Sequence, residues 1–310
     1  MSDDVSLYAP ATLRRLVEIH GGAVDERAPL DHPIVRIGAS DREGSVDLAP
    51  VLTPRGARNI VTGAAILLVA TSVSEEVPTG RRWVHPRADH VLAALLDAPR
   101  GPPFAPCGVA SSAPSDDERL EQGAIVGVGV VVTNGARVCA GAVVYPGVRI
   151  GARVIIGAGS VVGAPGFGFV DTLDGDRAAL RYPHRAGVVL GDDVEIGALC
   201  TVDAGIVGPT TIGAGTKLDA QVHVGHGVRV GARCRIAAQV GLAGSVVVED
   251  DVHIGGQAGV ADHVRIGRGA RIAAKSGVIG DVPEGAVFAG YPAVARARWL
   301  RGQARLYRGR

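Results

Sequence analysis

The sequence has few aromatic residues and no excess of charge of either sign. Phe, Trp and Tyr together make up 4% of the 310 residues, whereas hydrophobic residues make up 47%. A buried core must therefore be built mainly from Val, Ile, Leu and Ala. Lysine and arginine number 32 against 31 aspartates and glutamates, which gives a net charge of +1. This balance offers no electrostatic basis for a nucleic-acid partner.

Long apolar runs and paired cysteines are also missing. The longest apolar run, near Ile60–Ala70, is shorter than the roughly 20 residues of a membrane-spanning helix, and the N-terminus lacks the pattern of a secretory signal. The four cysteines form no CxxC motif, which favours unpaired thiols in a reducing compartment; they are Cys107, Cys139, Cys200 and Cys234. We therefore expect a cytoplasmic protein without a transmembrane segment.

The first hundred residues read as a small α/β domain, residues 1–100. Apolar residues at helical spacing predict helices over Tyr8–His20 and Ala88–Leu96, and buried strands are expected over Ile34–Ile37 and Ala64–Ala70. The following segment, Ala98–Asp117, is rich in Pro, Ser and Gly and reads as a linker or an irregular entry segment.

Beyond this segment, aliphatic residues recur every six positions. A first run extends from Leu120 to Val162, residues Ala164–Ala186 interrupt it, and the period returns at Leu190. After a slip of four residues the pattern continues without a break through twelve positions, namely Ile212, Leu218, Val224, Val230, Ile236, Leu242, Val248, Ile254, Val260, Ile266, Ile272 and Val278.

A six-residue period fits neither an α-helix nor a simple strand. It is typical of a coil with flat sides, in which each hexapeptide forms one side and its aliphatic residue points inward. Small residues follow most of these positions, many of them among the 45 glycines, and they let the chain turn a corner. The pattern predicts a mainly β protein whose central domain, residues 101–285, is a parallel β-helix of hexapeptide repeats. Residues 286–310 predict a turn and a short basic helix.

These repeats are similar to those of the hexapeptide-repeat acyltransferases, and this resemblance implies a left-handed coil and a homotrimer. Within that superfamily the chain most resembles the UDP-3-O-(3-hydroxyacyl)glucosamine N-acyltransferase family of lipid A biosynthesis. The resemblance rests on GAPGFGF (Gly163–Phe169), VVLGDDVEIGALCTVDAG (Val188–Gly205), IGAGTKLDAQVHVGHGVRVG (Ile212–Gly231), GLAGSV (Gly241–Val246), IGGQAGVADHVRIG (Ile254–Gly267) and PEGAVFAGYPA (Pro283–Ala293).

The resemblance implies acyl transfer from a thioester to a sugar amine, which requires a general base. Histidine is suited to this task near neutral pH, and His226 matches the family's base. The thioester oxygen needs a hydrogen-bond donor, worth about 3 kcal/mol. Gly244, one coil of three hexapeptides beyond His226, matches the family's backbone amide donor. Asp219 matches a family carboxylate that would orient or polarise a histidine.

Four further residues are candidates for substrate binding. His263 matches a family histidine near the nucleotide phosphates, and Gln221 belongs to the same KLDAQV motif as Asp219. Phe167 and Phe169 begin the interruption of the repeat, where a loop leaving a rigid scaffold often carries binding residues. Ordinary roles stay open for all of these positions, as solvated corner residues, a corner glycine or packing of the loop.

The sequence also departs from the family's pattern. The family's F-x-x-N-x-x-Y motif, which holds uracil between two aromatic rings, falls on Pro50, Thr53 and Gly56, so both rings and the asparagine are absent. Where the family has the motif D-R-G, this chain has Asp203-Ala204-Gly205, so the arginine is absent. A basic cluster in the tail provides charge that would attract an acidic acyl carrier protein; its members are Arg296, Arg298, Arg301, Arg305 and Arg308.

The leading hypothesis is an N-acyltransferase of lipid A biosynthesis. It moves an (R)-3-hydroxyacyl group from acyl carrier protein to the 2-amine of a UDP-3-O-acylglucosamine, with no bound cofactor or metal and with active sites in clefts between subunits. Two other classes stay open, an acetyl-coenzyme A-dependent sugar N-acetyltransferase and a non-catalytic β-helical scaffold. The HxxH of His223 and His226, with His253 as a third ligand, would instead suggest zinc.

Overall fold

The computed structural model describes residues 5–97, 119–171 and 179–307, so the expected linker Ala98–Asp117 lies outside the described residues. The chain forms two compact units. The first comprises residues 1–100, 168–186 and 206–208, and the second comprises 101–167, 187–205 and 209–310. This division differs from the contiguous boundaries expected from the sequence. Two segments between strands of the coil, residues 168–186 and 206–208, belong to the first unit because their apolar side chains pack on its core. These side chains are Tyr182, Ala186, Ile206 and Val207.

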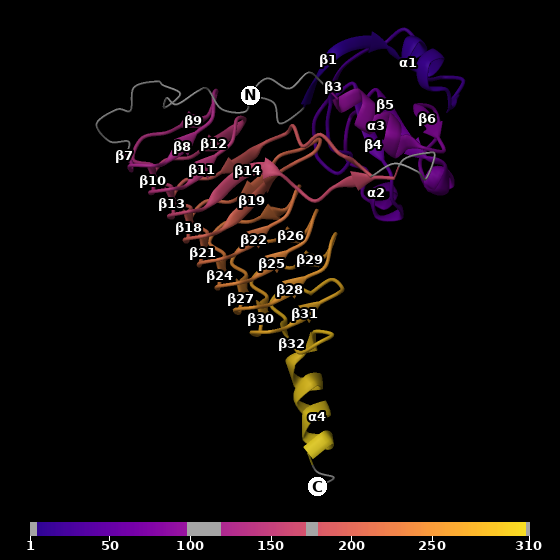
Figure 1. Ribbon diagram of the computed structural model, residues 1–310. Coiled ribbons are helices and arrows are strands. Elements are labelled where there is room, and N and C mark those ends of the chain that lie inside the picture. Colours follow the sequence, from indigo (N-terminus) through magenta and orange to yellow (C-terminus); the bar gives the residue numbers. More distant parts are fainter. Residues whose placement is uncertain (1–4, 98–118, 172–178, 308–310) are drawn as a thin grey trace. The chain divides into compact units, whose positions relative to one another are not determined.

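The first unit is a mixed six-stranded sheet between helices (Figure 1). Its strands, in spatial order, are β1 (Val5–Thr12), β3 (Pro33–Ile37), β4 (Leu48–Val51), β5 (Ile66–Ala70), β6 (Arg82–His85) and β2 (Ala23–Val24). Its helices are α1 (Leu13–His20), α2 (Pro54–Arg58), α3 (Ala88–Leu96) and the 3-10 helix η1 (Thr71–Glu76). Alternate residues of β5 enter two clusters: Ile66 and Leu68 pack with α1 and α3, and Leu67 and Val69 pack with α2 and η1.

The predicted helix Ala88–Leu96 and both predicted strands of this unit are confirmed. The predicted helix over Tyr8–His20 is wrong in its first part, where β1 runs to Thr12. Pro10 explains the difference, because it would remove a hydrogen bond from a helix interior but is tolerated in an edge strand. It falls in the irregular stretch of β1 between the pairs formed by Ser6 and Ala11. Thr12 then caps α1 by accepting a hydrogen bond from Arg15 N.

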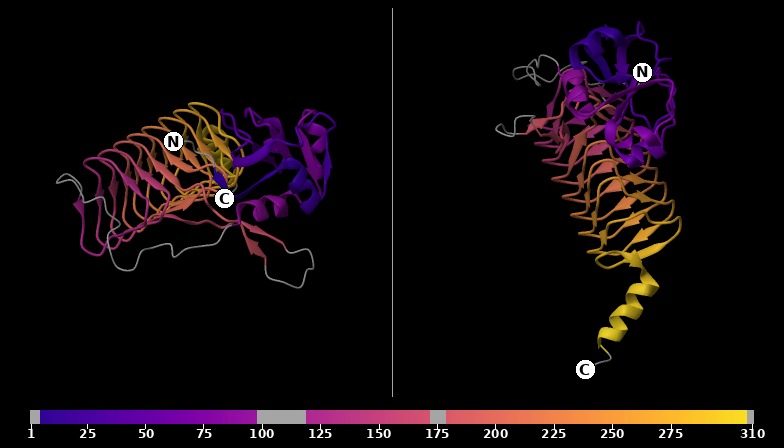
Figure 2. Two further views of the ribbon diagram at one scale, coloured as in Figure 1. Left: turned by 90° about the horizontal axis from the view of Figure 1, so that it is seen from above. Right: turned by 90° about the vertical axis from the view of Figure 1, so that its right-hand side faces the viewer.

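The second unit is a three-sided coil of parallel strands, as Figure 2 shows from two sides. The ten-stranded sheet contains β7 (Arg119–Leu120), β10 (Arg137–Val138), β13 (Ile155–Ile156), β18 (Glu195–Ile196), β21 (Lys217–Leu218), β24 (Arg235–Ile236), β27 (His253–Ile254), β30 (Arg271–Ile272), β32 (Val287–Ala289) and, antiparallel, β33 (Val294–Ala295).

The other two sides have eight and seven strands. The eight-stranded sheet contains β8 (Ile125–Val126), β11 (Val143–Val144), β14 (Val161–Pro165), β19 (Thr201–Ala204), β22 (His223–Val224), β25 (Gly241–Leu242), β28 (Gly259–Val260) and β31 (Gly277–Val278). The seven-stranded sheet contains β9 (Val131–Val132), β12 (Val148–Ile150), β17 (Val188–Leu190), β20 (Thr210–Ile212), β23 (Arg229–Val230), β26 (Val247–Val248) and β29 (Arg265–Ile266). A separate hairpin, β15 (Phe169–Val170) and β16 (Leu180–Arg181), belongs to the first unit.

The coil interior confirms the six-residue period. All twelve aliphatic positions from Ile212 to Val278 are buried. A second inward column, two residues before each of them, was not anticipated. It contains small residues such as Val222, Cys200 and Cys234, and burial raises the pKa of both thiols. The interior therefore takes two residues of every six. The fold class expected from the sequence, a parallel β-helix of hexapeptide repeats with a small α/β domain and a short C-terminal helix, is confirmed.

Three corners join the sheets and are named by one residue each. The Gln221 corner lies between the ten- and eight-stranded sheets, the His226 corner between the eight- and seven-stranded sheets, and the Arg233 corner between the seven- and ten-stranded sheets. The first residue of a corner is often glycine because the next coil is too close for a side chain. A Cβ on Gly213 would lie 2.5 Å from the carbonyl carbon of Gly231 in the next coil.

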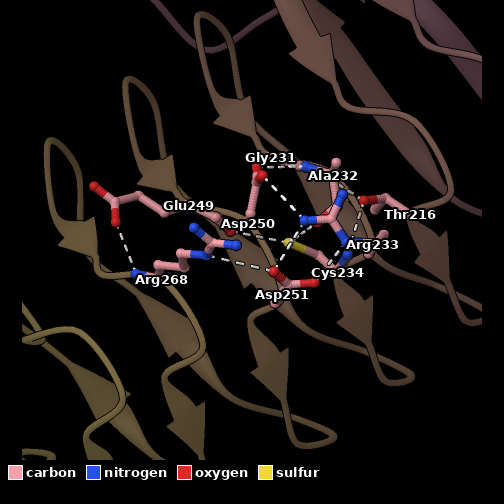
Figure 3. Close-up of polar contacts among 9 residues, drawn as sticks. All are labelled: Thr216, Gly231, Ala232, Arg233, Cys234, Glu249, Asp250, Asp251 and Arg268. Atoms are coloured by element: carbon pink, nitrogen blue, oxygen red, sulfur yellow. Dashed lines mark hydrogen bonds and ion pairs between the residues drawn. The ribbon is translucent and has the colours of Figure 1, made fainter.

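Polar side chains tie neighbouring coils together at the Arg233 corner (Figure 3). Asp250 Oδ1 accepts a hydrogen bond from Ala232 N at 2.9 Å, and Arg233 Nε donates to Asp251 Oδ1 at 2.7 Å. Arg268 Nε in the following coil lies 3.5 Å from Asp251 Oδ2. Exposed ion pairs such as these contribute at most about 1 kcal/mol each, so this corner is explained as a structural ladder.

The coil ends in the predicted turn and basic helix, α4 (Arg296–Tyr307). The Trp299 ring packs on Gly290, where a Cβ would lie 2.2 Å from Trp299 Cδ1. The predicted basic residues of α4 are exposed, and Arg308 lies outside the described residues. Among the helices that the structure describes, none is long and apolar enough to cross a membrane.

The close approach at corner glycines predicts a selective loss of stability. We expect Gly213→Ala to lower the free energy of unfolding by about 1–3 kcal/mol, because its Cβ would overlap backbone atoms. The control is Gly280→Ala, where a Cβ meets nothing within 4 Å and the expected change is within about 0.5 kcal/mol. Chemical denaturation measures both, and equal stability of the two variants would contradict this account of the corners.

Candidate functional site

His226 lies on a corner whose local sequence leaves room for its imidazole. It follows β22 and precedes β23, and its side chain is half-buried. In the next coil, a Cβ on Gly244 would lie 2.7 Å from both Cε1 and Nε2 of His226. The ring therefore lies directly over Gly244, and only glycine admits this contact. The structure thus brings together the two residues that the sequence predicted as base and oxyanion donor.

The Gly244 backbone has a free donor beside this ring. Its carbonyl accepts a hydrogen bond from His263 N at 3.0 Å, while its N–H makes no hydrogen bond within the described residues. At the Arg233 corner the equivalent amide, Ala232 N, is occupied by the Asp250 carboxylate. The Gly244 amide is thus available to an oxygen atom of a ligand.

The environment of His226 favours the neutral imidazole. Burial lowers its pKa from the ordinary value, and electrostatic interaction with the nearby His263 and His223 lowers it further. A neutral ring near pH 7 can accept a proton, as a general base must. His263 itself is exposed at the same corner two coils further on, with a φ of 58°.

Asp219 and Gln221 occupy a different corner of the coil. Strand β22 separates them from His226. Asp219 is exposed, and its Oδ1 accepts a hydrogen bond from Ala220 N at 2.7 Å. Gln221 Oε1 accepts from Gln239 Nε2 at 2.7 Å, and Gln239 Oε1 accepts from Gln257 Nε2 at 2.7 Å. Gln221 thus starts a structural glutamine ladder, and within one chain neither predicted residue lies at the His226 corner.

The two phenylalanines fall in different units. Phe167, in the second unit, is 85% exposed. Phe169, in β15 of the first unit, has the Arg181 guanidinium 4.5 Å from its ring centroid. Their predicted part in substrate binding stays a prediction.

The residues aligned with the family's uracil motif have local structural roles. Pro50 lies in β4, and Thr53 caps α2, where its Oγ1 accepts a hydrogen bond from Gly56 N at 3.1 Å.

A polar group beside His226 is not evident from the sequence. His223 Nδ1 lies 2.7 Å from Thr201 Oγ1, and His223 Nε2 lies 3.9 Å from Asp203 Oδ2. Asp203 is only 9% exposed. His223 comes one position before the inward residue Val224, so its side chain lies on the outer face. Because the six-residue count slips by four residues after Val202, it does not identify Thr201 and Asp203 as neighbours of His223.

The zinc alternative is not favoured within one chain. His253 lies on β27 of the ten-stranded sheet, whereas His223 lies on β22 of the eight-stranded sheet. The described residues contain no group of three or more His, Cys, Asp or Glu side chains placed to hold a metal ion.

A strip of bare backbone runs along the outer face of the eight-stranded sheet. Gly241, Gly259 and Gly277 stand in register on three successive strands. A Cβ on Gly241 or Gly259 would meet nothing within 4 Å, whereas Gly277 is covered by the Tyr291 ring. His223 stands in register with Gly241 at the other end of this strip. The glycine strip therefore offers a flat surface next to the His226 corner.

Comparison with known proteins finds similarity to bacterial transferases in part of the coil. Residues 209–244, which contain Asp219, Gln221, His226 and Gly244, match the family model for the bacterial transferase hexapeptide (six repeats). A solved structure of LpxA from Acinetobacter baumannii has a TM-score of 0.52 and 25% identity, covering 61% of this chain and 72% of that one.

Curated relatives confirm the resemblance expected from the sequence. UDP-3-O-acylglucosamine N-acyltransferase of Parasynechococcus marenigrum is 59% identical over 139 residues, which is 45% of this chain and 39% of that protein. The protein of the same name from Caulobacter vibrioides is 49% identical over 146 residues, 47% of this chain and 42% of the relative. The chain thus matches about two fifths of the length of these relatives.

The contact between His226 and Gly244 predicts how a single methyl group changes the imidazole. In Gly244→Ala the new Cβ would displace the ring toward solvent, so we expect the lowered pKa of His226 to rise toward its ordinary value of about 6.5. Titration by NMR measures this pKa, with His226→Gln assigning the resonance. Gly259→Ala is the control because its Cβ meets open space. An unchanged His226 pKa in Gly244→Ala would refute the contact.

Proposed function

We propose that the protein is an N-acyltransferase that moves an (R)-3-hydroxyacyl group from acyl carrier protein to the 2-amine of a UDP-3-O-acylglucosamine, in lipid A biosynthesis. The observation that carries this proposal is the His226 imidazole lying directly over Gly244, with a free Gly244 N–H beside it. The relatives' name, at 59% identity over the matched residues, supports the choice of substrate.

The reaction follows from this geometry. The neutral 2-amine of the sugar attacks the thioester carbonyl while His226, kept neutral by burial, takes one of the amine's N–H protons. The C–N bond forms while the carbonyl oxygen becomes an oxyanion, which the Gly244 N–H stabilises. The C–S bond then breaks, and the departing thiolate takes the proton from His226. No covalent acyl-enzyme is needed.

The remaining predicted residues require a neighbouring copy. Because Asp219 lies at the Gln221 corner, its proposed action on a histidine needs a second chain to bring that corner to His226. This fits a cytoplasmic homotrimer with active sites between subunits. His263, exposed at the His226 corner, is proposed to contact the nucleotide phosphates. The exposed arginines of α4 give an acidic carrier protein a complementary surface.

A second candidate is an acetyl-coenzyme A-dependent sugar N-acetyltransferase. It is favoured by the absence of stacking aromatics at Pro50 and Gly56. Pro50 lies in strand β4, and Gly56 lies in α2, where its N–H donates a hydrogen bond to the capping residue Thr53. Turnover with acetyl-coenzyme A but not with 3-hydroxyacyl carrier protein would select this candidate.

Removal of the base tests the proposed mechanism. We expect His226→Ala to lower kcat/KM for acyl transfer at least hundredfold, because proton transfer by a positioned side chain contributes about 10²–10⁴. Transfer from 3-hydroxyacyl carrier protein to the sugar nucleotide is the assay. Ser245→Ala, at the same corner in the next coil, is the control. Activity of His226→Ala within tenfold of the wild type would exclude His226 as the base.

The glycine strip predicts a dependence on acyl length. If the donor's acyl chain lies along Gly241 and Gly259, then Gly259→Val places a branched side chain in its way without disturbing the coil, since the site is open. We expect kcat/KM to fall at least tenfold for a long 3-hydroxyacyl donor and less than threefold for a short one, a difference on the order of 1 kcal/mol. Equal losses for both donors would contradict this placement.

A further inference from the structure

A column of basic side chains runs along the outer face of the ten-stranded sheet. Lys217, Arg235, His253 and Arg271 stand in register on the successive strands β21, β24, β27 and β30. Neighbouring parallel strands are about 4.8 Å apart, so these side chains emerge close together. We call this set the basic column.

Most of the basic column lacks acidic partners. Lys217 Nζ lies 3.5 Å from Glu195 Oε2 at the end of the column. By contrast, no ion pair or hydrogen bond within the described residues engages the side chains of Arg235, His253 or Arg271. Elsewhere on the coil, outward arginines are paired, as Arg153 is with Asp193. Arg235 and Arg271 carry the same charge on one face of the sheet, and neither has a partner in the described part of the chain that offsets their repulsion, so packing alone does not explain the unpaired column.

The basic column also borders a hollow. The hollow has a volume of about 620 Å³ and is lined by the four column residues, by Glu195 and Asp219, and by small residues such as Gly197 and Gly255. Glu195 is engaged by Lys217, and Asp219 Oδ1 is engaged by Ala220 N. The unpaired positive charges therefore face a space that a small ligand can enter.

We propose that the basic column is a binding site for phosphate groups of a diphosphate or phosphodiester ligand. Two guanidinium groups, each able to bind two phosphate oxygens in the plane of its fork, stand on either side of His253. A diphosphate bridges such neighbouring donors and neutralises the repulsion between them. The site lies on a different sheet from the glycine strip, and although Asp219 lines the hollow, the test does not depend on the proposed reaction because binding is measured without turnover.

Binding of inorganic pyrophosphate to the purified full chain tests the site. Isothermal titration calorimetry at low salt compares the wild type with the double variant Arg235→Gln/Arg271→Gln. We expect the dissociation constant to rise at least tenfold in the double variant, because two fixed charges are lost from one site. The charge-conserving Arg235→Lys/Arg271→Lys should bind more weakly than the wild type but better than the double glutamine variant, since lysine keeps the charge and loses the fork.

The matched control and the competing ligands complete the experiment. Lys275→Gln removes an exposed charge at the neighbouring Gln221 corner and should change the dissociation constant less than twofold. Competition by UDP but not uridine assigns the phosphates to a nucleotide, and competition by coenzyme A assigns them to a pantetheine-bearing donor. No measurable pyrophosphate binding, an unchanged constant in the double glutamine variant, or an equal loss in Lys275→Gln would overturn the proposal.

Discussion

The backbone of each coil stacks closely on the backbone of the next, and this spacing determines which side chains the corners and faces of the coil can hold. Each coil forms hydrogen bonds to the next, as in Gly213 N to Val230 O at 2.8 Å, and this spacing leaves no room for a side chain at corner positions such as Gly213 and Gly231. Because every coil repeats the same three sides, a residue at one corner always meets its counterpart in the next coil. This repetition produces columns of equivalent residues in successive coils. One column consists of glutamines, another of arginines paired with carboxylates, and a third of glycines.

The candidate site uses the same rule. His226 can lie over the next coil only because Gly244 has no side chain, and this packing also buries the imidazole and lowers its pKa. The candidate site therefore lies where the repeated contact between equivalent side chains is interrupted, because the large side chain of His226 faces Gly244, which has none. The glycine strip is a second place where side chains are missing from successive coils, and it lies on the sheet that precedes this corner.

The periodic parts of the molecule were predictable from sequence because one inward residue repeats without a break. The same arithmetic, three hexapeptides to a coil, predicted that His226 and Gly244 would meet. The second inward column escaped notice because its residues vary from Val to Cys and Thr. The pairing of His223 with Asp203 could not be predicted because the chain leaves the coil between Gly205 and Pro209, and the six-residue period does not continue across this segment. Strand β1 was mistaken for helix because apolar spacing outweighed Pro10.

We propose that acyl transfer takes place between the His226 imidazole and the Gly244 amide, and a crystal structure with the N-acylated product bound is the decisive experiment. We expect the product's amide oxygen to lie within hydrogen-bond distance, about 3 Å, of Gly244 N, and its amide nitrogen to lie equally near His226 Nε2. A product bound with its amide at any other corner of the coil would rule out this pair of residues.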